Sequence, residues 1–240
     1  MDLCPGTIAG NVAHILDNIR SAAVRSGRRP DLVRLVAATK LVPPDRIVEV
    51  LAAGVTILGE NRLQEALPKI ERLGQDPIVW HFIGRLQRRK VKAIVGRFAL
   101  IHSVESIELA EEINRRAAEA GIRQAVLLEV NMGEEASKGG FPPQAVAEAC
   151  RRMDGLAHVA VKGLMTIPPP DPDVDRTRMY FRRLRELAHS LTQTGWEHIN
   201  MDELSMGMSA DYRIAVEEGA TLVRIGTAIF GARGSYAADG

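Results

Sequence analysis

Short apolar runs of strand type alternate with helical stretches along the whole chain, and this alternation constrains the fold more than any other feature. Each run is rich in β-branched and other apolar residues and is bounded by turn signals. The eight runs cover about 32–39, 55–58, 78–83, 98–102, 125–130, 159–165, 199–205 and 221–225. Apolar strands separated by helices predict a parallel sheet covered by helices. Eight such units fit a closed (β/α)8 barrel, or TIM barrel, better than an open doubly wound sheet.

The predicted helices carry apolar stripes with start and stop signals. The segment that begins at Pro44 ends at Gly54, and further stripes lie at 109–117 and 181–191. An additional helix is predicted over about 7–26, ahead of the first strand, where it would plug or flank the barrel. We therefore expect one domain over residues 1–240, with a short flexible tail from about residue 233.

Composition narrows the classes of partner. The formal net charge is +1, so no global field favours nucleic acid or an anionic membrane. No stretch has the length of a membrane span and residues 1–6 do not resemble a secretion leader, which predicts a cytoplasmic protein. Cys4 and Cys150 lack metal-ligand spacing with the histidines, so no metal site is expected. Basic runs at 85–92 and 176–185 fit the solvated faces of two amphipathic helices better than an RNA-binding surface.

Lys40 closes the first predicted strand, so its amine is expected at the carboxyl edge of the barrel. Active sites of such barrels form at this edge, and the loops after the seventh and eighth strands commonly hold a phosphate. In this chain those loops contain small residues and hydroxyl groups, namely Ser205, Ser209, Gly226 and Thr227. An amine that faces a phosphate-binding loop favours pyridoxal 5'-phosphate (PLP), whose aldehyde forms a Schiff base with lysine.

Several of these residues also have an ordinary structural interpretation. A lysine at a strand end is often a solvated charge or half of an ion pair. Ser209 suits the N-cap of a helix over 210–218, and Asn61, which would reach a ligand from the end of the second strand, suits a helix cap equally well. His81 is more typical of a satisfied core residue than of a site. The residues alone leave these alternatives open.

Taken together, six blocks of sequence resemble the pyridoxal phosphate homeostasis protein family: 36–40 (VAATK), 59–65 (GENRLQE), 80–87 (WHFIGRLQ), 163–165 (GLM), 204–211 (LSMGMSAD) and 224–231 (RIGTAIFG). The resemblance spans nearly the whole chain and implies a barrel like the N-terminal domain of alanine racemase. It implies that PLP is carried as a Schiff base on Lys40. The other implied contacts are Ser205, Ser209, Gly226 and Thr227 at the phosphate, Asn61 and Met165 beside the ring, and Arg224 at the pyridine nitrogen. One departure is the segment LQRRK at 86–90, where the family often has asparagine before the lysine.

The same resemblance implies a carrier or regulator of the vitamin B6 pool, without established enzymatic activity, whose partners are PLP and possible recipient apo-enzymes. An arginine cation at the pyridine nitrogen disfavours its protonation and weakens the ring as an electron sink. About fifteen residues follow the eighth predicted strand, too few for the second domain of an alanine racemase, which favours a monomeric, non-catalytic protein. Two alternatives stay open: a PLP-dependent racemase-like enzyme of low activity, and a class I aldolase.

Overall fold

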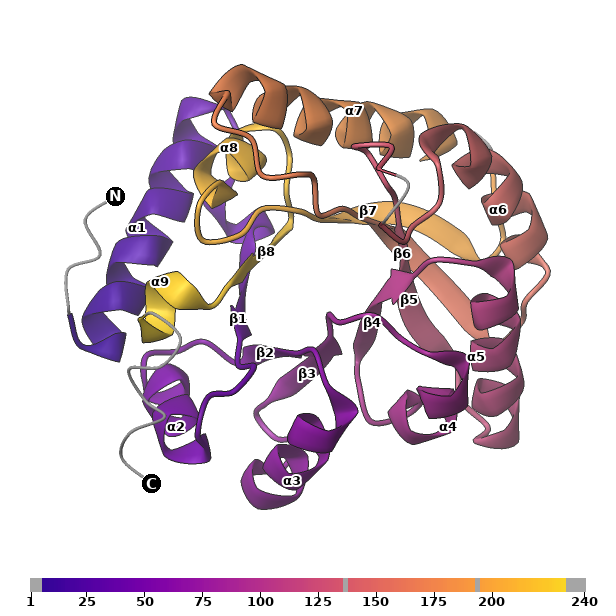
Figure 1. Cartoon of the computed structure of the whole chain (residues 1–240), viewed down its shortest axis with the longest axis horizontal. Coiled ribbons are helices and arrows are strands. Elements are labelled where there is room, and N and C mark those ends of the chain that lie inside the picture. The colour runs from indigo at the N-terminus through magenta and orange to yellow at the C-terminus, as the bar shows by residue number, and fades with distance from the viewer. Residues whose placement is uncertain (1–5, 136–137, 193–194, 232–240) are drawn as a thin grey trace.

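The computed structural model describes residues 6–231 except 136–137 and 193–194, and its parallel strands close into a barrel in chain order (Figure 1). The strands are β1 (Arg34–Ala38), β2 (Ile57–Glu60), β3 (Val79–Phe82), β4 (Leu100–Val104), β5 (Gln124–Glu129), β6 (Val159–Met165), β7 (Ile199–Ser205) and β8 (Leu222–Ile225). Every strand lies within two residues of its predicted position, so the predicted (β/α)8 barrel is confirmed. The predicted tail from about residue 233 lies outside the described residues.

Helices surround the ring of strands on its outer side (Figure 1). They are α1 (Ile8–Arg25), α2 (Pro44–Ala52), α3 (Leu63–Leu73), α4 (Val91–Ile94), α5 (Ile107–Glu119), α6 (Val146–Asp154), α7 (Val174–Thr192), α8 (Tyr212–Glu217) and α9 (Thr227–Phe230), with short 3-10 turns η1 (Pro30–Leu32), η2 (Arg88–Lys90) and η3 (Pro143–Ala145). Local sequence sets several starts. The hydroxyls of Thr7 and Ser106 accept hydrogen bonds from the first turns of α1 and α5, and Pro44 begins α2.

Two apolar layers stabilise the barrel. The large layer lies between the strands and the helices, and the small one fills the barrel interior. The interior layer consists of Val36, Leu100, Leu127, Met165 and Leu222, with Ile57 and Ala125 packed against it. Side chains alternate along a strand, so residues two positions beyond these also point inward at the carboxyl ends. Three of those five positions carry polar side chains, namely His102, Glu129 and Arg224, so the mouth of the barrel is partly polar inside.

Helix α1 flanks the barrel beside α8 and α9 and does not plug it (Figure 1). The side chain of Asn11 donates a hydrogen bond to the carbonyl of Ile229 at 2.9 Å, and Asn18 donates to the Tyr212 hydroxyl at 3.1 Å. The predicted extra helix over 7–26 is thus confirmed at 8–25, and its apolar face is covered by the last helices of the chain.

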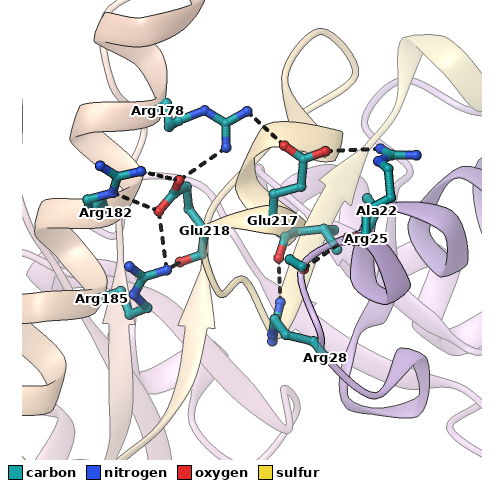
Figure 2. A network of polar contacts seen from close by, with 10 residues as sticks. Ala22, Arg25, Arg28, Arg178, Arg182, Arg185, Glu217 and Glu218 are labelled. Atoms are coloured by element: carbon teal, nitrogen blue, oxygen red, sulfur yellow. Dashed lines mark hydrogen bonds and ion pairs between the residues drawn. The ribbon is translucent and has the colours of Figure 1, made fainter.

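A network of arginines and glutamates joins α7 to α8 and α1 (Figure 2). The Glu218 side chain is 5% exposed and forms ion pairs with Arg178, Arg182 and Arg185, while Glu217 pairs with Arg178 and Arg25. The prediction that the basic run at 176–185 forms a solvated face is therefore only partly right, because three of its arginines bind Glu217 or Glu218 at the C-terminal end of α8.

The basic run at 85–92 does not form one helix, so that part of the prediction is wrong. Arg85 lies in the loop after β3 and pairs with Glu105 at 2.9 Å, while the turn η2 and the four-residue α4 follow. The reason is local: the buried residues Leu86 and Val91 are five positions apart, a spacing that does not place two side chains on one face of a helix. The arginines Arg85, Arg88 and Arg89 are nevertheless exposed, as predicted.

Three further properties bear on function. Among the residues in the described ranges, no helix is long and apolar enough to cross a membrane. The same ranges contain no group of three or more His, Cys, Asp or Glu side chains able to hold a metal ion. Cys150 is a buried free thiol whose pKa is raised by burial to about 12, so its thiolate is disfavoured. Cys4 lies outside the described residues.

Candidate functional site

Lys40 lies two residues past the end of β1, at the carboxyl mouth of the barrel, and its side chain is half-buried. In the part of the chain that the structure describes, its amine makes no hydrogen bond or ion pair. The described residues therefore give no support to the ion-pair interpretation of this lysine. A partner-free primary amine at a barrel mouth is available to attack an aldehyde.

The turn that carries Lys40 is fixed by its own backbone. The amide of Thr39 donates to the carbonyl of Gly59 at 2.9 Å, and the amide of Val42 donates back to the Thr39 carbonyl at 3.0 Å. Leu41 has a φ of 60°, a left-handed conformation that is uncommon outside glycine. The chain therefore reverses direction at Lys40 through a defined turn.

Asn61 follows β2 directly, beside the end of β1, and its side chain is half-buried. The backbone of Asn61 packs directly against Gly84, because a Cβ atom on Gly84 would lie 2.3 Å from the Asn61 carbonyl oxygen. Helix α3 is preceded by Arg62 as its N-cap residue, without a capping side-chain hydrogen bond. The capping interpretation of Asn61 is therefore wrong. The side-chain amide of Asn61 has no hydrogen-bond partner among the described residues.

Arg224 and Ser205 meet inside the barrel from β8 and β7. Arg224 Nη1 donates to the Ser205 hydroxyl at 2.5 Å, and Nη2 donates to the carbonyl of Thr166 at 2.9 Å. Burial lowers the pKa of Arg224 to about 10, so the guanidinium stays charged at neutral pH. These two contacts fix the plane of a buried cation at the mouth of the barrel.

Two histidines that the sequence did not place in the site extend this arrangement into the barrel. His102 Nδ1 lies 2.8 Å from the Ser205 hydroxyl, and His102 Nε2 lies 3.0 Å from His81 Nδ1. Both rings are buried, which confirms His81 as a satisfied interior residue. Strand alternation could have indicated His102, because it stands two positions after the interior residue Leu100.

The loops after β7 and β8 are joined through Ser209. Its hydroxyl accepts a hydrogen bond from the amide of Ala228 at 3.3 Å, at the start of α9. The N-cap of α8 is Asp211, so the interpretation of Ser209 as the cap of a helix over 210–218 is wrong. Thr227 is exposed beside this contact. A hydroxyl from each loop thus stands at the same edge of the barrel.

Gly226 and Met165 complete the predicted set. A Cβ atom on Gly226 would lie 3.2 Å from the carbonyl oxygen of Ala38, so β8 passes close to the strand that leads to Lys40. Met165 is buried inside the barrel and is the register partner of Ser205 and of Glu129. All eight predicted residues therefore lie at or just beyond the carboxyl ends of five strands: Lys40, Asn61, Met165, Ser205, Ser209, Arg224, Gly226 and Thr227.

The chain is similar to known proteins over almost its whole length. The model of the alanine racemase N-terminal domain matches residues 11–234. A pyridoxal phosphate homeostasis protein from Aquifex aeolicus is 46% identical over 222 residues, covering 92% of this chain and 96% of the relative. One from Pseudomonas aeruginosa is 40% identical, covering 95% and 96%. The structure of PipY from Synechococcus elongatus with PLP bound superimposes with a TM-score of 0.81 at 36% identity, covering 94% of this chain and 100% of that one.

Proposed function

The chain belongs to the pyridoxal phosphate homeostasis protein family, built on the alanine racemase N-terminal domain, and from this premise we propose that it binds PLP and takes part in vitamin B6 homeostasis. The observation that carries the proposal is the Lys40 amine, half-buried at the barrel mouth and without a partner among the described residues. We propose that Lys40 holds the aldehyde as a Schiff base, which makes the binding covalent and reversible.

The chemistry of the donor set fits this cofactor. A phosphate ester needs hydroxyl and amide donors, and Ser209, Thr227 and the backbone at Gly226 supply them on the rim formed by β7 and β8. Asn61 brings an unengaged amide on the other side of β1, and Met165 supplies an apolar surface. The Ser205 hydroxyl is already bonded to Arg224 and His102. We therefore propose that Ser205 orients Arg224, in addition to any contact it makes with the phosphate.

Arg224 supports a binding role without catalytic turnover. PLP supplies an electron sink to the enzymes that use it, and the sink is strongest when the pyridine nitrogen carries a proton. A guanidinium that is fixed by Ser205 and Thr166 and stays charged at neutral pH opposes a proton on a nitrogen beside it. The protein then holds the aldehyde, excludes stray amines, and releases it to an amino acid or to a recipient apo-enzyme.

Borohydride trapping tests the covalent step. Purified protein is incubated with PLP, reduced with borohydride, digested and analysed by peptide mass spectrometry. The expected result is a PLP-modified peptide containing Lys40, together with visible absorption that is lost in Lys40→Ala. Lys92→Ala, which removes an exposed lysine of α4, is the matched control and keeps both signals. A colourless protein without modification at Lys40 would exclude this function.

Proton exchange tests the absence of turnover. The loaded protein is mixed with L-alanine or D-alanine in deuterium oxide, and exchange of the α-proton is followed by NMR. We expect exchange no faster than with the same concentration of free PLP. Racemisation over many turnovers would instead support the racemase-like alternative.

A further inference from the structure

A buried ion pair lies in the layer between β2 and α3, outside the barrel interior. Lys69 on α3 is 7% exposed and Glu60 at the end of β2 is fully buried, with Lys69 Nζ 2.6 Å from Glu60 Oε1. A buried ion pair is weak evidence for stability, because the cost of removing both charges from water offsets their attraction. Its contacts with the rest of the fold therefore decide what it does.

Both members of the pair form hydrogen bonds with Thr39, the residue before Lys40. Lys69 Nζ donates to the Thr39 carbonyl at 2.7 Å, and the Thr39 hydroxyl donates to Glu60 Oε1 at 2.6 Å. The Thr39 amide is bonded to Gly59. The carbonyl, hydroxyl and amide of this residue are thus all fixed, and the first two depend on the ion pair.

Helix α3 also holds the residue after Lys40. Glu65 Oε2 accepts a hydrogen bond from the amide of Leu41 at 2.9 Å. Leu41 is half-exposed and has a φ of 60°, so packing of its side chain does not explain its strained backbone. Glu65 and Lys69 stand four residues apart on α3 and therefore on one face of the helix. One face of α3 thus contacts the chain on both sides of Lys40.

We propose that Lys69, Glu60 and Glu65 are positioning residues that hold the Thr39–Leu41 turn, so that the Lys40 amine stays directed into the barrel mouth. This inference rests on the proposed function of Lys40. The three residues act through the turn and not by contact with the cofactor. Glu60 is well suited to this, because its second oxygen, Oε2, is buried and has no partner among the described residues. Among the described residues, the carboxylate of Glu60 is therefore stabilised by Lys69 and Thr39 alone.

The main test replaces the charged pair with neutral groups of similar shape. Glu60→Gln combined with Lys69→Met keeps an acceptor for the Thr39 hydroxyl and removes the bond to the Thr39 carbonyl. We expect adduct formation between PLP and Lys40, trapped with borohydride over time, to slow by about tenfold to a hundredfold. We also expect faster hydrogen–deuterium exchange at the amides of residues 40–42 in the cofactor-free protein, which a merely stabilising pair would not cause locally.

Arg72→Met is the matched control, because Arg72 lies on the same helix and forms an exposed pair with Asp45 at 2.7 Å, and neither residue bonds to Thr39, Lys40 or Leu41 among the described contacts. It should leave both measurements unchanged. Glu65→Met removes only the acceptor of the Leu41 amide and is expected to speed exchange at residues 41–42 and to slow adduct formation. If the double variant does not fold, Glu65→Met still decides whether α3 holds the turn at Leu41.

Wild-type adduct rate and wild-type exchange at residues 40–42 in these variants would overturn the inference. Failure of the proposed function gives a different result: the wild-type protein itself would form no adduct at Lys40. The exchange measurement on the cofactor-free protein then still decides whether α3 holds the turn.

Discussion

His102 Nε2 lies 3.0 Å from His81 Nδ1 inside the barrel, so two imidazoles share one hydrogen bond away from water. Burial lowers the pKa of His81 to about 3. Burial, together with the charges of His81, Arg224 and Arg34, lowers the pKa of His102 well below its usual value. Both rings are therefore neutral in the folded protein at neutral pH.

We expect this pair to make the protein sensitive to acid. Below about pH 6.5 the unfolded chain binds a proton on each histidine that the folded chain does not, so the free energy of unfolding falls as the pH drops towards 3. Each histidine contributes about 1.4 kcal/mol per pH unit in this window. His81→Gln keeps a hydrogen-bonding group for His102 and should flatten the slope by about one proton. Urea unfolding at several pH values measures it.

The exposed histidine of α1 provides the control for the acid experiment. His14→Gln makes the same exchange on the solvent side of α1 and shows what replacing a histidine outside the barrel interior does to stability. An unchanged slope in His81→Gln would show that the interior histidines do not dominate the acid response.

The two serines of the site should differ in what they contribute. Ser205→Ala leaves Arg224 Nη1 and His102 Nδ1 without their shared partner, and we expect a loss of about 1.5–3 kcal/mol in the free energy of unfolding. Ser209→Ala removes a single contact of 3.3 Å at a half-buried position and should cost below about 1 kcal/mol. Ser209→Ala should instead weaken PLP binding, measured by titration. Equal stability losses in the two variants would contradict this division.

Gly163 should not accept a side chain. Its φ is 149°, and a Cβ atom there would lie 1.8 Å from the carbonyl oxygen of Glu203 on the neighbouring strand β7. Gly163→Ala must therefore separate β6 from β7, and we expect a loss above about 3 kcal/mol or failure to fold. Gly121→Ala, at a φ of 66° with open space around it, should cost only about 1–2 kcal/mol. Denaturant unfolding of the two variants compares them, and similar losses would argue against the clash.

Glu218 should matter more than an ordinary surface glutamate. Burial alone would raise the pKa of Glu218, but hydrogen bonds from Arg182 and Arg178 outweigh it and the pKa is lowered. The stabilisation that these ion pairs give is thus present above the pKa of Glu218 in the unfolded chain. It is lost as the pH falls through the lower pKa of Glu218 in the folded protein. We expect Glu218→Gln to cost about 1–3 kcal/mol at neutral pH, whereas Glu148→Gln, which removes an exposed pair with Arg151, should cost below about 0.5 kcal/mol. Thermal and urea unfolding check the difference.

The strands could be predicted from sequence because buried parallel strands read as apolar runs, but the predicted ranges of β2 and β4 begin and end two residues too early. β2 continues through Gly59 to Glu60, and β4 continues to Val104 past His102 and Ser103. Polar side chains lie at the ends of these two strands, Glu60 on β2 and His102 and Ser103 on β4. In the fold each of them has a partner: Lys69 for Glu60, Ser205 for His102, and the carbonyl of Gly84 for Ser103.

The site was predictable to the extent that it follows from topology. Residues at the carboxyl ends of parallel strands must share one edge, so Lys40, Asn61 and Ser205 could be placed together from the strand order alone. Contacts between side chains could not. The bond from Lys69 to Thr39 joins residues 30 apart, and nothing in either local sequence specifies it. Such contacts depend on the exact depth and rotation of a helix on the sheet.

The closure between β1 and β8 also shapes how the protein must be made. Residues 34–37 of β1 pair with residues 222–225 of β8, and α1 packs on the last helices. At a translation rate of about 5–20 residues per second, β8 is synthesised roughly ten seconds or more after β1. The free edge of β1 is open to the wrong strands throughout that interval. A ribosome that stalls before β8 should therefore yield an aggregation-prone nascent chain in place of a smaller folded protein.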